Sequence, residues 1–230
     1  MKTCSFSFLI FMIVAGLPNF AFPNEKTSHA STIRIDESLR KCKELIRRLS
    51  PGVQTNALQS IEIARFTAQQ GLDETVVPLL KAKVEPRTGE ESHANELGFD
   101  TDVDRAVVGQ TAFPIFEVSL NDLRHFAPDT QVTNLLTYTY QLLFPVEVDE
   151  RVKSSITVRF VPDTSGEGEM EKTEKKTGWR LTRWGLPNLI RKLTAQLPSG
   201  QQGFLLVIPA LNRYFLGYVD NSDLNLVPLA

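Results

Sequence analysis

From residue 105 to the C-terminus, short β-rich runs alternate with turn residues, and this pattern constrains the fold more than any other feature of the chain. Residues 149–150 and 220–223 are turn residues between neighbouring runs, so hairpins dominate. Hairpins join antiparallel strands, which predicts a mainly antiparallel sheet. The expected strands cover residues 113–118, 142–148, 152–161, 179–184, 204–208, 213–219 and 224–228.

Two helices are expected between these strands. Ser119 begins a short helix with a capping-box-like pattern, and Pro128 follows its end. Pro187 occupies the first turn of a second helix, which Pro198 closes. With these helices packed against one face of the sheet, the fold class is α+β.

An N-terminal helical appendage is predicted over residues 36–84. Its first helix is capped by Asp36 or Ser38. A second helix covers residues 55–70, with Gly71 as its left-handed stop, and a short third segment follows.

Three polar stretches separate or precede these parts. Residues 22–35 lack hydrophobic periodicity and are expected to form a flexible tail. Residues 85–104 contain seven acidic side chains against the single basic Arg87, which predicts an acidic linker. Residues 162–177 are dense in charge and are expected to form a mobile loop within the α+β domain, which spans residues 105–230.

The first 21 residues follow the pattern of a secretory signal peptide, in which a charged start is followed by an apolar run and then by small residues. Lys2 precedes an apolar run over residues 6–17, which ends at small and helix-breaking residues. Cleavage after Gly16 and cleavage after Ala21 both remain open, as does an uncleaved anchor helix. The expectation is a periplasmic or secreted protein whose mature chain has no transmembrane helix.

Composition narrows the class of protein. The net charge is −2, and this balance does not favour nucleic acid as a partner. Hydrophobic residues make up 42% of the chain, enough for one sizeable core. Removal of the signal leaves Cys42 as the only cysteine, so no internal disulfide can form. Cys42 shares a helical face with Leu39 and Ile46, which predicts that it is buried.

No catalytic residues, metal site or cofactor are predicted. The three histidines have no metal-ligand spacing, and Gly-x-Ser-x-Gly is missing. His125 lies near Asp122 and Asp129, and these three residues are the alternative site if the protein is a hydrolase or transferase.

One cluster of aromatic and basic residues suggests a binding surface, formed by Trp179, Arg180, Arg183 and Trp184. Strict strand alternation would place Trp179 and Arg183 on one face, and Arg180 and Trp184 on the other. Arginine forks and indole rings suit a protein, a glycan or another anionic ligand of the cell envelope. The sequence therefore predicts an exported, non-catalytic accessory or binding protein.

Overall fold

The computed structural model describes residues 26–83, 97–99, 103–127, 129, 131–162 and 177–229, with side chains from residue 37 onward. The predicted signal peptide, most of the acidic linker and most of the loop over residues 162–177 lie outside the described residues. The described part contains an eight-stranded sheet with the order β5-β4-β3-β2-β6-β7-β8, and β1 pairs with β3. The fold is α+β, as predicted.

The predicted strands are present, and β1 is an addition that the sequence did not suggest. All neighbouring strands are antiparallel except β2 and β6, which are parallel. The strands are β1 (Val107–Val108), β2 (Phe113–Glu117), β3 (Thr137–Val148), β4 (Arg151–Val161), β5 (Gly178–Gly185), β6 (Gly203–Ile208), β7 (Arg213–Asp220) and β8 (Asp223–Pro228).

The predicted hairpin turns are confirmed by the backbone. Asp149 and Glu150 have φ values of 49° and 62°, and they join β3 to β4. Asn221 and Ser222 have φ values of 45° and 82° and join β7 to β8. Two successive residues with positive φ match the right-handed twist of the paired strands, so these turns set the pairing of the residues next to them. In the hairpin of β3 and β4, the register then shifts at Lys153, which is an extra residue of β4.

The first helix, α1 (Lys26–Leu49), begins well before Asp36 and Ser38. The predicted start was therefore wrong, and residues 26–35 of the expected tail are helical. The sequence between Lys26 and Leu49 contains no glycine or proline. Because nothing interrupts the backbone hydrogen bonds, the helix extends toward the N-terminus even though hydrophobic periodicity is missing there.

The expected second helix is divided at Ser60, and Gly71 does not end it. Gly71 has a helical φ of −63°, and the chain continues directly into a π-helical turn. A Cβ atom at Gly71 would lie 3.1 Å from Cδ2 of Leu181, so this glycine allows close packing of the helix on β5. These elements are α2 (Thr55–Gln59), α3 (Ile61–Gly71), the π-helix Leu72–Val76 and α4 (Val77–Lys83).

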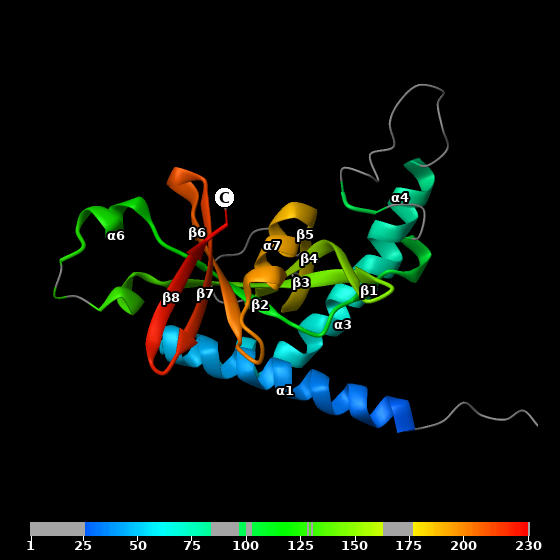
Figure 1. Ribbon diagram of the computed structural model, residues 1–230, viewed down its shortest axis with the longest axis horizontal. Helices are drawn as coiled ribbons and strands as arrows, with labels where there is room; N and C mark the ends of the chain where they lie inside the picture. Colours follow the sequence, from blue (N-terminus) through cyan, green and yellow to red (C-terminus); the bar gives the residue numbers. More distant parts are fainter. Residues whose placement is uncertain are drawn as a thin grey trace, which may run out of the picture.

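Helices cover both faces of the sheet, which corrects the expectation of one covered face. The helices α1 and α3 share a core with Phe116 and Phe144, whereas α7 (Pro187–Gln196) packs on Phe113 and Leu143 from the other side. Figure 1 shows α1 and α7 on opposite sides of the sheet. The strands β2 and β6 are apolar at successive positions, so both of their faces need cover.

The N-terminal helices pack directly on the sheet. Cys42 is fully buried in the shared core, as predicted, and burial raises the pKa of its thiol. Phe99 and Val103, near the end of the predicted linker, are buried in the same core. The domain boundaries themselves stay predictions. None of the helices in the described part of the chain has the length and apolar character to cross a membrane.

Candidate functional site

The strand β5 carries the four residues predicted to bind a ligand, and it lies at one end of the sheet. Its pairing with β4 is interrupted by a bulge. Val158 pairs with Leu181, and the next residue of β4, Thr157, pairs with Arg183. Thr182 is therefore an extra residue in β5, and its hydroxyl donates a hydrogen bond of 3.2 Å to the carbonyl of Thr157.

The bulge overturns the prediction that each face of β5 mixes a tryptophan with an arginine. Trp179 and Trp184 pair with Phe160 and Ile156 of β4, so both tryptophans lie on the face covered by α1 and α3. A strand with strict alternation would separate them. The inserted residue shifts the alternation by one position between Leu181 and Arg183, which brings the two arginines onto the opposite face.

Trp179 has a structural role. Its side chain is 7% exposed, and its ring packs on Phe160 with 5.6 Å between ring centroids. The indole Nε1 donates a hydrogen bond of 3.1 Å to Oγ of Ser60, at the break between α2 and α3. Trp184 is half-buried against the same core. The structure therefore places both tryptophans in packing contacts, and their role in binding stays a prediction.

The arginines form an exposed group on the other face. Arg180 pairs directly with Arg159 of β4, and Arg183 pairs with Thr157. All three arginines are exposed, and we call the surface formed by Arg159, Arg180 and Arg183 the basic face. Arg159 was not a predicted site residue. It is one of three basic residues in β4, and only the register of β4 with β5 reveals its place beside Arg180.

The surroundings of the basic face are polar on one side and apolar on the other. The row of residues through Arg180 and Arg159 continues to Gln141 of β3, which is half-buried. The row through Arg183 and Thr157 continues to Leu143, which belongs to the core under α7. The basic face thus lies beside the area that α7 covers, and its guanidinium groups are presented from adjacent positions of a rigid sheet.

Like charges at directly opposed positions of a sheet are destabilising. Arg159 and Arg180 occupy such positions in this sheet. The net charge of the chain is −2, so the pair does not reflect a general excess of positive charge. Guanidinium groups in this arrangement can each donate two parallel hydrogen bonds to a carboxylate or phosphate.

The alternative site around His125 is an exposed helix end. The helix α6 (Leu120–Arg124) is capped by Ser119, whose Oγ accepts a hydrogen bond of 3.0 Å from the backbone of Asp122. The ring Nδ1 of His125 lies 2.8 Å from the carbonyl oxygen of Asn121, one turn earlier. His125, Asp122 and Asp129 are all exposed. The contacts described for His125 and Asp122 are those of helix capping.

A second polar cluster connects α3 to β1. Arg65 donates a hydrogen bond of 3.0 Å to the carbonyl of Val108, and the Gln69 side chain accepts one of 2.9 Å from the backbone of the same residue. Burial raises the pKa of Glu147, nearby Arg65 opposes this effect, and Glu150 adds to it. The hydrogen bonds made by Arg65 and Gln69 end on one backbone unit, so their role is to hold β1 against the helix.

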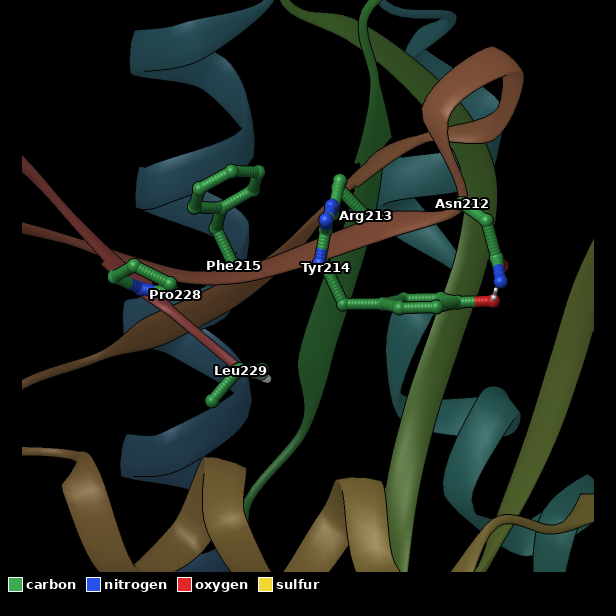
Figure 2. Close-up of a pocket in the computed structure, with 6 residues that line it drawn as sticks. All are labelled: Asn212, Arg213, Tyr214, Phe215, Pro228 and Leu229. Carbon is green, nitrogen blue, oxygen red and sulfur yellow. Dashed lines mark hydrogen bonds between the residues drawn. The ribbon is translucent and has the colours of Figure 1, made fainter.

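A small pocket lies where β7 begins and β8 ends. It has a volume of about 190 Å³, below the roughly 300 Å³ at which small-molecule sites begin. Figure 2 shows the Tyr214 hydroxyl directed toward the side-chain oxygen of Asn212, at 3.4 Å. The lining residues are Asn212, Arg213, Tyr214, Phe215, Pro228 and Leu229.

Within the described ranges, no group of three or more His, Cys, Asp or Glu side chains is placed to hold a metal ion. Among the arrangements described above, the basic face is the one whose geometry best suits a ligand, and the ligand it suits is an anionic group. The chain matches no protein-family model, and no curated protein or solved structure is significantly similar to it.

Proposed function

We propose that this protein is an exported, non-catalytic accessory or binding protein of the cell envelope, and that its basic face binds anionic groups of a partner. The observation that carries the proposal is the bulge at Thr182, which gathers Arg180 and Arg183 on the face that already carries Arg159. The anionic group can belong to a protein or a glycan, because both present carboxylates.

The position of the arginines on one face supports this proposal. An arginine directly opposite another arginine weakens the sheet, whereas a neutral β-forming residue at either position would not. The two tryptophans pack on the covered face, and the arginines lie on the opposite one. A binding role gives a reason for guanidinium groups at these positions.

The proposed export depends on the N-terminal sequence. One positive charge followed by an apolar run and small residues is the order that export machinery recognises. Mass spectrometry of the tagged full-length chain, expressed in its native host, should find the mature N-terminus after residue 16 or residue 21 and the protein outside the cytosol. An intact N-terminus on a cytosolic protein would contradict the proposal of export.

Anion binding can be tested with a fluorescein-labelled polyglutamate peptide and the mature chain. We expect Arg159→Gln and Arg183→Gln each to weaken binding by about two- to five-fold, as expected for exposed charge pairs. Arg48→Gln is the matched control, because it removes the same charge from α1 on the other side of the sheet. Equal binding by all four proteins would contradict the assignment of the basic face.

The alternative, a hydrolase or transferase that uses His125, stays a prediction. The hydrogen bond described for His125 does not distinguish a reactive histidine from a residue at a helix end. The basic face has the more specific geometry, so the binding function is the one that we propose.

A further inference from the structure

The strand β8 forms the end of the sheet opposite β5, and Figure 1 shows it in red beside β7. In the described part of the chain, β8 pairs with β7 on one side and with no strand on the other. Its pairing with β7 has no shift of register, whereas β5 is bulged. A regular edge strand with unpaired backbone groups is a template for another strand.

The hydrogen bonds to β7 show which backbone groups of β8 point outward. The amide of Leu229 donates a hydrogen bond of 2.9 Å to the carbonyl of Tyr214. Bonded and non-bonded pairs alternate along an antiparallel ladder, so the non-bonded residues of β8 are Leu224, Leu226 and Pro228. Their N–H and C=O groups point away from β7, except that proline has no N–H. Within the described ranges, no backbone group outside the sheet bonds to Leu224 or Leu226.

These outward groups are arranged so that β8 can pair with a second β8. A two-fold axis at Asn225 places Leu224 of each copy opposite Leu226 of the other, and each opposed pair then exchanges both hydrogen bonds. An axis at Leu226 would place Leu224 opposite Pro228, which has no N–H to donate. The position of the proline therefore favours the register that is centred on Asn225.

The side chains of β8 are compatible with this register. Asn225 meets Asn225 of the second copy, and an amide can both donate to and accept from another amide. Asp223 is the only charged residue of β8, and it lies opposite Val227, so no like charges are opposed. Leu226 is 39% exposed, and pairing places it beside Leu224 of the second copy, which removes apolar surface from water.

We infer that β8 is a self-association surface, on which the β8 strand of a second copy pairs in the antiparallel direction about a two-fold axis at Asn225. The inference goes beyond the proposed function and does not depend on it, because the basic face lies at the other end of the sheet. A contact limited to one six-residue strand is small beside the roughly 1,200 Å² of a standard interface. We therefore expect a weak dimer, whose population rises with protein concentration.

The register can be tested with cysteine variants of the mature chain, in which the native Cys42 is fully buried. Opposed residues of a non-bonded antiparallel pair have Cα atoms about 4.5 Å apart, which is within the range of disulfides. We expect Asn225→Cys to form a disulfide-linked dimer under mild oxidation. Asp223→Cys is the matched control, because Asp223 lies on the same face of β8 but opposite Val227, and this variant should stay monomeric. Equal cross-linking of both variants, or of neither, would overturn the inference.

Sedimentation velocity from about 1 µM to about 1 mM, the range of weak complexes, tests the association itself. The parent chain should form dimers as its concentration rises. Asn225→Asp and Asn225→Lys should each stay monomeric, because like charges meet at the axis, and an equimolar mixture of the two should dimerise again. Recovery in the mixture shows that both variants are folded. A parent that is monomeric over the whole range, or a dimer that both variants keep, would overturn the inference.

Amide exchange measured by NMR identifies the groups that the dimer covers. Dimerisation should slow exchange at Leu224 and Leu226, whose N–H groups point outward, and should leave Asn225, which bonds to β7, nearly unchanged. Slow exchange at Leu224 and Leu226 in a monomeric parent would mean that another segment covers the edge, and the inference would be wrong. A dimer with unchanged exchange at both leucines would place the contact elsewhere and would also overturn it.

Discussion

Arg159 of β4 and Arg180 of β5 occupy directly opposed positions on the same face of the sheet. Opposed residues have Cβ atoms about 4.5 to 5.5 Å apart, so two positive charges share a small area of surface. This relationship connects the edge of the sheet to the proposed function, because it places two groups that can attract an anion side by side.

The first prediction is a gain in stability on neutralising Arg159. Arg159→Gln removes the repulsion across β4 and β5, and we expect the free energy of unfolding to rise by about 0.2 to 1 kcal/mol at low salt. The gain should shrink in high salt, which screens the charges. Urea denaturation at two salt concentrations measures both effects. A variant that is less stable than the parent protein would show that the arginine stabilises the sheet.

A second prediction concerns the hydrogen bond between Trp179 and Ser60. Ser60→Ala leaves the indole N–H of a buried ring without its acceptor, at a cost of about 1 to 3 kcal/mol. Trp179→Phe removes the donor as well and loses part of the packing on Phe160. In a double-mutant cycle, Ser60→Ala should cost less in the Trp179→Phe background than in the parent. Strictly additive costs would mean that the hydrogen bond contributes nothing.

Gly217 provides a third prediction, because it lies opposite Phe204. A Cβ atom at Gly217 would lie 2.1 Å from Cζ of the fully buried Phe204 ring. We expect Gly217→Ala to destabilise the protein by roughly 1 to 3 kcal/mol or more through overpacking. The control is Gly52→Ala, whose added atom meets nothing within 4 Å. Phe204→Leu should recover part of the loss, and a neutral Gly217→Ala variant would contradict the packing described here.

The fourth prediction is a pH dependence at Glu147. Burial raises its pKa in the folded state, with Arg65 opposing and Glu150 adding to the effect. The folded protein therefore favours the protonated carboxyl, so this contribution to stability is present at low pH and is lost as pH rises through the folded pKa.

Gln imitates the protonated form of this side chain. Glu147→Gln should consequently be more stable than the parent at about pH 7, and the difference should shrink toward about pH 4, near the ordinary pKa of glutamate. Thermal unfolding of both proteins across this range gives the comparison. A difference that grows as pH falls would mean that the ion attraction of Arg65 outweighs burial.

The sequence was sufficient to predict elements whose signals are local. The turn residues Asp149 and Glu150 predicted a hairpin, and Ser119 predicted a helix cap, because each depends on the chemistry of adjacent residues. The prediction that Gly71 ends the second helix was wrong. A glycine that allows close packing on Leu181 looks the same in the sequence as a glycine that stops a helix.

The basic face depends on pairing between strands that are distant along the chain. Thr182 is an ordinary strand residue, and nothing in its neighbours marks it as the bulge that realigns Arg183 and Trp184. Strict alternation therefore assigned these two side chains to the wrong faces. Arg159 was missed for a related reason, since its place beside Arg180 follows from the register of β4 and β5.

The most direct test of the central claim is a reversal of charge on the basic face. The mature chain with Arg180→Glu and Arg183→Glu should lose binding to labelled polyglutamate and gain binding to labelled polylysine, since the geometry stays and the sign changes. Circular dichroism checks that the variant keeps its fold. If the reversed protein still binds polyglutamate as the parent does, or if the parent binds neither probe, the basic face is not the binding surface of this protein.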